Sequence, residues 1–464
     1  MKSFSSKIFS FIIVTTCGFF ASNVSAVNIN HQGVGQALIY PYYTVRNGQV
    51  GLLSVENNST TPKEVRVQIY EGLAGQAVLS FNVYLSSEDT WTVFMTNDNE
   101  GVASIITGDI SCTVPTFPPS TLLNLRDELY KEDAGDNDSK NRLQEGYIEI
   151  IELSQLSGEH AEWSNPSSDE FNCTKIMNSW VNANGVWRDG GTVDTAAISG
   201  PGSISGSFNI VDPLVGSSAS YSALALANFD QADNNHIIEP GDLSFNLSHA
   251  GDSNGEVVSK VVINGDVITS HWENDSDGNG QTGLDAVSAV LMHSGIMNNF
   301  SSEHIASMGT YSDWVISQPT KNGYVKGDGS DALGPYTAAL TGDGACEPVE
   351  VEAYSREGII SAGYPVDNLD MLCWNTTTLS FNNDSTLSSL LNSRIDTNTS
   401  TGKLKLGLGL GLEGVALVSD EGHEYFGLPA VGFLVQEFID SDSSDKASYM
   451  GLYQHKYKQL LNVD

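Results

Sequence analysis

Short runs of alternating apolar and polar residues constrain this chain more than any other feature. They are bounded by clusters of Asn, Gly, Ser and Thr, and they recur over residues 36–111 and through the last third of the chain. Alternation with a period of two places one set of side chains on each face of a β-strand. The sequence therefore predicts a mainly β protein built from tandem immunoglobulin-like β-sandwich domains with a mixed α/β middle region.

The domain organisation follows from the length of the chain and from where its composition changes. A chain of 464 residues with 40% hydrophobic residues is long enough for two or three packed cores. Apolar residues between 284 and 300 recur with roughly helical spacing, which predicts a helix near 284–300. The predicted parts are a signal peptide (1–26), a β-sandwich domain (27–111), the mixed middle region (112–300) and a second β-rich, sandwich-like domain (301–464).

Two further patterns concern the strands themselves. Residues 65–70 (VRVQIY) resemble residues 349–354 (VEVEAY), and Leu-Ser-Phe-Asn follows each of them, at 79–82 and at 379–382. A duplication would explain this likeness, but alternating strands also produce such matches by chance. In residues 404–412 leucine occupies every even position and glycine most odd ones, which predicts a strand with one buried leucine face. If exposed, that strand is a candidate edge for assembly.

The first 26 residues predict export. Lys2 and Lys7 precede a short apolar segment over 8–20, and Val24-Ser25-Ala26 has the small residues of a cleavage site. After this segment the chain lacks a run of 18 apolar residues, so the mature chain is expected to have no transmembrane segment. The expected location is the periplasm, the cell surface or the extracellular space.

The charge balance excludes several classes of partner. The chain has 21 Lys and Arg against 57 Asp and Glu, giving a formal net charge of −36. A nucleic-acid binder needs basic residues to neutralise phosphates, and binding to an anionic lipid surface needs them too. An acidic surface keeps an exported protein dispersed by self-repulsion and attracts divalent cations.

Four cysteines lie outside the signal peptide: Cys112, Cys173, Cys346 and Cys373. An even number of cysteines in an exported chain predicts two disulfides. Proximity in the sequence favours pairing the first two and the last two, which is one of three possible connectivities. The alternative is a set of free, buried thiols.

One segment resembles the first half of a calcium-binding loop. Asp275, Asp277 and Asn279 supply oxygen atoms at alternate positions before a glycine, as in the loops that wrap one hard cation. The Gln281 carbonyl and Asp285 would complete the ligand set, although the final acid falls one position early. The alternative is a polar turn that caps the helix that follows. Calcium is the one cofactor that the sequence suggests.

The sequence shows no complete catalytic motif. The serines of segment 202–206 are misplaced for a nucleophile elbow, and His423-Glu424 lacks a second histidine four residues on. The glycines of 409–414 lie within a predicted strand, whereas a dinucleotide site needs a strand before them and a helix after them. Paired carboxylates for glycoside hydrolysis depend on a separation in space that the sequence does not reveal.

Two of the tryptophans are candidates for sugar-stacking platforms. Trp180 and Trp187 lie in a polar, Asn-rich segment where exposed rings could stack on a saccharide. Core packing is the favoured interpretation, because large aromatic residues are mostly buried. Trp91 and Trp374 are expected in the core, within strands.

The chain resembles a family of uncharacterised exported proteins of Gram-negative bacteria. The most specific segment is 33–45, GVGQALIYPYYTV. Similar segments follow nearly to the end of the chain, at 146–152, 285–292, 312–316, 319–321, 372–374 and 426–433. The resemblance implies an exported, β-rich protein and carries no activity or catalytic residues with it.

Together these features favour a non-enzymatic exported protein of the cell surface or extracellular matrix, with a structural or adhesive, binding role. Its partner would be a protein, a polysaccharide or a second copy of the chain. Two alternatives stay open: an exported glycan-active enzyme that uses paired carboxylates, and a calcium-dependent binding module.

Overall fold

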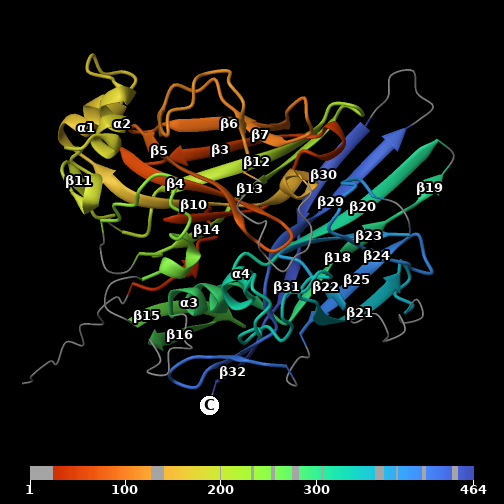
Figure 1. Ribbon diagram of the computed structural model, residues 1–464. Helices are drawn as coiled ribbons and strands as arrows, with labels where there is room; N and C mark the ends of the chain where they lie inside the picture. The colour runs from red at the N-terminus through yellow and green to blue at the C-terminus, as the bar shows by residue number, and fades with distance from the viewer. Residues whose placement is uncertain are drawn as a thin grey trace, which may run out of the picture.

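The computed structural model describes residues 25–126, 140–198, 200–230, 235–251, 256–273, 282–305, 307–360, 370–382, 385–409, 414–440 and 448–463. In this part of the chain strands predominate over helices, and most strand pairs are antiparallel (Figure 1). The expectation of a mainly β protein is confirmed.

Two sheets form the first sandwich. The β10 sheet has the order β1 (Asn28–Ile29), β14 (Leu224–Ala227), β2 (Ala37–Thr44), β10 (Glu145–Leu156), β4 (Lys63–Glu71), β5 (Ala77–Leu85) and β8 (Cys112–Val114), and β11 (Thr195–Ala196) pairs with β10. The β3 sheet has the order β13 (Ser217–Ser222), β12 (Ile204–Asp212), β3 (Val50–Asn57), β6 (Thr90–Asn97), β7 (Ala103–Ile106) and β9 (Leu123–Asn124). Strands from residues 145–227 thus join those from residues 28–124 in one unit.

Alternation along each strand builds the core of this sandwich. In β4, Val65, Val67 and Ile69 enter the core between the two sheets. The residues that alternate with them, including Glu64 and Arg66, lie on the outer face of the β10 sheet and are nevertheless buried. Other parts of the chain must therefore cover that outer face.

The second sandwich also has two sheets. The β25 sheet has the order β22 (Asp370–Leu372), β21 (Glu347–Ser355), β25 (Thr401–Leu408), β18 (Gly295–Ser301) and β31 (Lys456–Lys458). The β20 sheet has the order β24 (Asn392–Ile395), β23 (Thr376–Phe381), β20 (Met308–Ser317), β29 (Val431–Asp440) and β30 (Ser448–Gln454), and β19 (His304–Ile305) pairs with β20.

The central strands of the β20 sheet, β20 and β29, are buried on both faces over residues 314–316 and 433–435, and they join the two sandwiches. Trp314 and Leu434, which are paired in register, pack toward the β25 sheet. Val315, Phe433 and Val435 point the other way and belong to the core of the first sandwich. Because apolar packing continues from one sandwich into the other, the described chain forms one packed body and not two independently packed domains.

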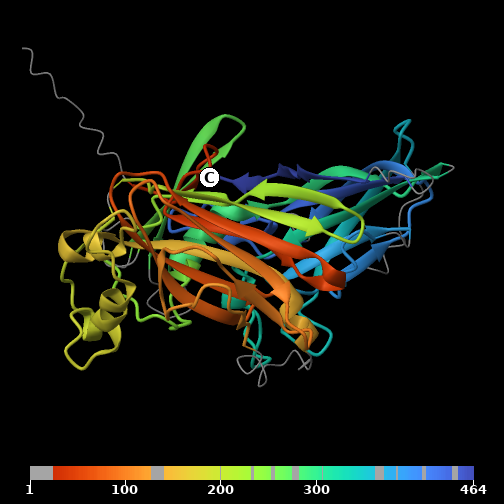
Figure 2. The ribbon, with the colours of Figure 1, turned by 90° about the horizontal axis from the view of Figure 1, so that it is seen from above.

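Two covers lie on the outer face of the β10 sheet. One consists of α3 (Thr282–Leu291), the hairpin of β15 (Glu256–Ile263) and β16 (Asp266–Glu273), and the short sheets of β17 (Met292–His293) with β28 (Leu428–Pro429) and of β26 (Leu417–Val418), β27 (Glu424–Phe426) and β32 (Leu460–Asn462). The other consists of α1 (Gly158–Ser164) and α2 (Cys173–Val181). Figures 1 and 2 show α1 and α2 at the end of the molecule away from the second sandwich. The short helix α4 (Lys321–Tyr324) is labelled in Figure 1.

The helix predicted near 284–300 is shorter than expected. It corresponds to α3, which ends at Leu291, and residues 295–301 form β18. Ile296 and Phe300, four residues apart, satisfy a period of two as well as a helical period, so the pattern could not separate the two structures. Pairing of β18 with β25 and β31 decides for the strand.

Two strand hypotheses need correction. The leucine strand is β25, and it pairs on both sides, with β21 and β18, so it offers no free edge. Its leucines at 404, 406 and 408 are buried in the second core. The segments that suggested a duplication are not equivalent either, because β4 and β5 are neighbours in one sheet whereas β21 and β23 lie in different sheets.

Candidate functional site

The two sandwiches meet at a junction where backbone hydrogen bonds join them directly. The N–H groups of Asn375 and Thr376 donate to the carbonyl oxygens of Leu73 and Gly72, at 3.0 and 2.7 Å. A Cβ atom at position 72 would lie 2.4 Å from Leu391 Cδ1, so a larger residue there would force the Leu391 side chain to shift. The turn after β4 is thus held against the start of β23.

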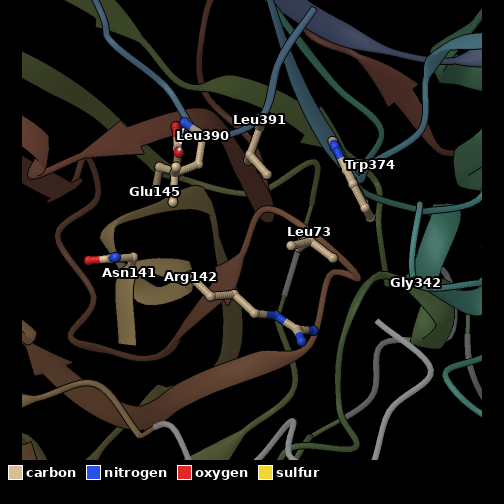
Figure 3. Close-up of a pocket in the computed structure, with 8 residues that line it drawn as sticks. All are labelled: Leu73, Asn141, Arg142, Glu145, Gly342, Trp374, Leu390 and Leu391. Carbon is tan, nitrogen blue, oxygen red and sulfur yellow. Dashed lines mark hydrogen bonds between the residues drawn. The ribbon is translucent and has the colours of Figure 1, made fainter. Parts of the chain in front are cut away.

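A hollow of about 170 Å³ lies at this junction (Figure 3). It is lined by Leu73, Asn141, Arg142, Glu145, Gly342, Trp374, Leu390 and Leu391. Figure 3 shows Leu73, Leu391 and Trp374 around one space, whereas the guanidinium of Arg142 points away from Glu145. An apolar cavity of about 150 Å³ holds a molecule of the size of benzene, so this hollow has room for one ring or one branched aliphatic group.

A buried ion pair lies beneath the hollow. Glu71, the last residue of β4, accepts two hydrogen bonds from Arg142, with Nε to Oε2 at 2.8 Å and Nη2 to Oε1 at 3.1 Å. Both side chains are 0% exposed. The Glu71 carboxylate also accepts from the backbone N–H groups of Leu73, Ala74 and Gln76, which fixes the turn that carries Leu73. These bonds occupy its acceptor positions.

Glu145, the first residue of β10, connects both sandwiches in the same way. Its carboxylate accepts from the Tyr42 hydroxyl at 3.0 Å, the Ser389 hydroxyl at 2.5 Å and the Leu390 N–H at 2.7 Å. Arg46 Nε lies 3.8 Å from Oε1. Burial raises the pKa of Glu145, and these hydrogen bonds oppose that rise. The carboxylate thereby anchors the loop that brings Leu390 to the hollow.

The segment GVGQALIYPYYTV is explained by this arrangement. It contains β2, in which Tyr40, Tyr42 and Tyr43 are completely buried. Their hydroxyls donate to the Ser54 carbonyl, the Glu145 carboxylate and the Leu143 carbonyl, respectively. The tyrosines therefore build the core and the floor of the junction.

The wall that carries Trp374 is fixed by a disulfide and a buried lysine. Lys321 Nζ donates to the carbonyl oxygens of Ala345 at 2.7 Å and Leu372 at 3.0 Å, next to the Cys346–Cys373 bond. Burial lowers the pKa of Lys321 to about 7. Trp374 was expected in the core within a strand, but it is half-buried, precedes β23 and lines the hollow.

The chemistry of the hollow favours binding over catalysis. Glu71 and Glu145 are buried and already hydrogen-bonded within the protein, so neither presents a free acid or base. Among the lining residues of the hollow, Leu390 and Trp374 supply accessible apolar surface and Asn141 supplies accessible polar surface. Sequence reasoning missed this site. Glu71 and Glu145 are each followed by a glycine, but four other Glu-Gly pairs occur in the chain, so this pattern does not single them out.

A second group of buried ionisable side chains lies on the outer face of the β10 sheet. Glu149 accepts a hydrogen bond from the Tyr70 hydroxyl at 2.9 Å, and Glu64 accepts from Tyr84 at 2.8 Å. Burial raises the pKa of Glu149 to about 8 and that of Glu64 to about 7. Arg66 Nε donates to Gln68, but its two terminal nitrogens make no hydrogen bond to the described residues. Burying Glu64, Arg66 and Glu149 costs desolvation free energy, which apolar burial in the two sandwiches must offset.

Four of the five residues of the predicted calcium site lie outside the described part of the chain, so the calcium site stays a prediction. Asp275, Asp277, Asn279 and Gln281 lie outside the described residues. Asp285 lies in the first turn of α3, where its Oδ1 accepts from the Tyr324 hydroxyl at 2.6 Å. Among the described residues, no three His, Cys, Asp or Glu side chains form a group that could hold a metal ion.

The cysteines pair as proximity suggested. Cys112 is bonded to Cys173, and Cys346 to Cys373. The first bond links α2 to β8 at the edge of the β10 sheet. The second links Cys346 and Cys373, which directly follow Ala345 and Leu372, the two residues whose carbonyl oxygens accept from Lys321. Both disulfide predictions are confirmed.

Trp180 and Trp187 pack in the core, as the sequence favoured. Trp187 is 0% exposed and stacks on Tyr84 with ring centroids 5.7 Å apart, and Trp180 Nε1 donates to the same tyrosine. Their rings cover the outer face of the β10 sheet near β5 and β8. They offer no open platform for a saccharide.

Under these tryptophans the fold places a Ser–His–Asp arrangement that sequence spacing did not reveal. His160 Nε2 lies 2.9 Å from Ser179 Oγ, and His160 Nδ1 lies 2.9 Å from Asp194 Oδ2. These are the partners and distances of a hydrolytic triad. The three residues come from α1, α2 and the loop that follows them.

The surroundings of Ser179 do not suit a nucleophile. Ser179 and His160 are 5% and 2% exposed, and the Ser179 hydroxyl also lies 3.2 Å from the Lys175 carbonyl of its own helix. Ser179 belongs to the last turn of α2, where the carbonyl ends of the helix disfavour a developing oxyanion. We therefore interpret this arrangement as a hydrogen-bond network that holds α1, α2 and the loop together.

Comparison with known proteins adds no function to this geometry. No family model, no curated protein and no solved structure matches the chain. Within the described residues, none of the helices combines the length and the apolar character needed to cross a membrane.

Proposed function

We propose that this chain is an exported, non-enzymatic binding protein of the cell surface or extracellular matrix, with a structural or adhesive role. The observation that carries the proposal is the hydrogen-bonded state of the buried carboxylates at the junction. The carboxylates of Glu71 and Glu145 are fully engaged in hydrogen bonds that hold the fold together. The hollow beside them therefore suits binding of a side chain or other group from a partner, with no acid or base left to catalyse a reaction on it. A single aromatic ring or branched aliphatic group of a partner is the occupant that its size and apolar lining suit.

The proposed location outside the cytoplasm is supported by several independent features. The first 26 residues have the pattern of a signal peptide, the four remaining cysteines form two disulfides, and the net charge is strongly negative. Disulfides persist in oxidising compartments. The resemblance of residues 33–45 to exported proteins of Gram-negative bacteria supports the same address, within which the periplasm, the cell surface and the extracellular space stay open.

Two finer descriptions belong to this proposal. Face-to-face packing of antiparallel sheets supports an immunoglobulin-like character for both sandwiches. The half-motif over residues 275–281, together with Asp285, supports calcium binding before α3. A melting temperature that rises saturably with calcium, and no longer does so in Asp275→Ala, would support that ion site.

The test of the main proposal separates binding from catalysis. Purified mature protein is incubated with a panel of neutral and acidic polysaccharides, and the release of reducing ends is measured. We expect no release, because the junction carboxylates are buried and occupied. The same protein should not react with a fluorophosphonate, because Ser179 is covered.

Either reaction would contradict the proposal and identify the residue responsible. Release of reducing ends that disappears in Glu145→Gln would favour the alternative, a glycan-active enzyme that uses paired carboxylates. Fluorophosphonate labelling that disappears in Ser179→Ala would make the Ser–His–Asp arrangement catalytic. Labelling of a denatured sample serves as the control for non-specific reaction.

A further inference from the structure

The edge strand β30 presents two exposed tyrosines on one face. Met450 and Leu452 point into the core that the sandwiches share, so Tyr449 and Tyr453 point the other way. Their exposed fractions are 58% and 43%. β30 is the last strand of the β20 sheet, next to β29 (Figure 1).

The two rings form a continuous surface because a glycine lies between them. A Cβ atom at position 451 would lie 2.8 Å from the Tyr453 hydroxyl and 2.9 Å from Cε2 of its ring, so the Tyr453 ring leans across Gly451. The hydroxyls of Tyr449 and Tyr453 are 3.4 Å apart. The rise of a strand separates the two Cα atoms by about 13 Å, so the rings form an elongated platform rather than a pocket.

The described residues directly opposite the tyrosine platform are uncharged. On the same face of β29, beyond Phe438, the carboxylate of Asp440 accepts a hydrogen bond from Ser307 Oγ at 3.0 Å. In register on β29, Phe438 lies opposite Tyr449 and Gln436 lies opposite Gly451. Asn298 of β18 donates through Nδ2 to the carbonyl oxygens of Tyr453 and Gln454, at 3.3 Å in each case. Amide and hydroxyl groups therefore border an aromatic surface in a chain with a net charge of −36.

The size of the platform argues against a folded protein partner. Taking roughly 200 Å² for a whole tyrosine side chain, the two exposed fractions amount to about 200 Å² of ring surface. A stable protein interface buries about 800 Å² on each partner. A narrow polymer, lying along the strand and stacking on both rings, makes full use of a surface of this size.

The charge of the chain narrows the class of polymer. An anionic polymer would be repelled by the acidic surface within a Debye length of about 8 to 10 Å. A cationic polymer would bind to carboxylates on other parts of the surface, because the two tyrosines of the platform carry none. We propose that the tyrosine platform of β30 binds an uncharged polysaccharide, with sugar rings stacked on Tyr449 and Tyr453 and hydroxyls bonded to the bordering amides.

This inference rests on the proposed binding role and names one partner class, at a surface separate from the junction hollow. The experiment is native electrophoresis of the mature protein in gels that contain hydroxyethyl cellulose, galactomannan, dextran or, as the anionic comparison, alginate. We expect at least one neutral polymer to retard the protein and alginate to leave its mobility unchanged.

Four variants and one control locate the effect. Tyr449→Ala and Tyr453→Ala should each weaken the association about threefold to tenfold, and the double variant should weaken it more than tenfold. Gly451→Ala keeps both rings but displaces Tyr453, so it should weaken binding as well. Phe94→Ala is the matched control, since Phe94 is an aromatic residue of β6 that is 52% exposed on another sheet. Its retardation should equal that of the unmodified protein.

Several results would overturn the inference. No retardation in the three neutral gels, or equal retardation of the double variant at an unchanged melting temperature, would show that the platform does not bind these polymers. Sedimentation that reveals oligomers lost in the double variant would assign the tyrosines to self-association instead. None of these results produces reducing ends or fluorophosphonate labelling, so the non-enzymatic proposal would stand on its own test.

Discussion

Replacing Glu71 with alanine should lower the free energy of unfolding by about 3 to 5 kcal/mol, because it leaves a buried charge without its partner. Arg142 would lose both of its hydrogen bonds to a group that, like itself, is fully buried. Three backbone N–H groups of the turn after β4 would also lose their acceptor. Urea unfolding at pH 7, followed by intrinsic fluorescence, measures the change.

A matched surface pair serves as the control for this result. Arg394 and Asp396 also form an ion pair, but their side chains are 50% and 52% exposed, so Asp396→Ala should change the unfolding free energy by less than about 0.5 kcal/mol. Arg142→Met should cost less than Glu71→Ala, because Glu71 keeps its three N–H donors. If Glu71→Ala cost no more than the surface variant, the junction would not depend on this pair.

Replacing Glu149 with glutamine should change how stability depends on pH. Burial raises the pKa of Glu149 from about 4.5 to about 8, so the folded protein keeps a proton that the unfolded chain releases. The stability that this proton contributes is fully present below pH 4.5 and is lost as the pH rises through about 8. Glu149→Gln keeps an acceptor for Tyr70 and does not ionise. It should therefore become more stable than the unmodified protein with rising pH, by up to about 5 kcal/mol at pH 8.

The measurement is the difference between the two unfolding curves at pH values from 4.5 to 8.5. A difference is needed because other buried groups contribute in this range, among them Asp313, whose pKa burial raises to about 7. Glu64→Gln provides the comparison. The pKa of Glu64 is raised to about 7, so its difference should level off about one pH unit earlier. A difference for Glu149→Gln that stays flat, or that falls with rising pH, would contradict a buried, protonated Glu149.

Some features of this protein could be predicted because they depend on local pattern or on chain entropy. Alternation of side chains identified β-strands at 65–70 and 78–85, since burial of one strand face imposes a period of two. The short separations favoured Cys112–Cys173 and Cys346–Cys373, because closing a short loop costs less entropy. The start of α3 followed from helical spacing, whereas its end did not, because Ile296 and Phe300 fit both periods.

The candidate site could not be predicted in the same way. Its lining residues come from the turn after β4, the residues before β10, the segment around the second disulfide and the loop before β24. Nothing in the spacing of Leu73, Glu145 and Leu390 along the chain indicates that they meet. The alternation in β4 predicts that its polar face is exposed to water, because one face of an antiparallel sheet usually is. In the structure that face is covered and buried.

The mainly β class, the two disulfides and the excess of negative charge could be predicted from the sequence, because each follows from residue type and local spacing. The pairing of the strands, the burial of the central strands of the β20 sheet on both faces, and the places of β25 inside its sheet and β30 at an edge emerged from the fold alone. Sheet order depends on contacts between distant segments, and a period of two is the same for an edge strand and a central one. For that reason the leucines of β25 ended in a core and the tyrosines of β30 on the surface.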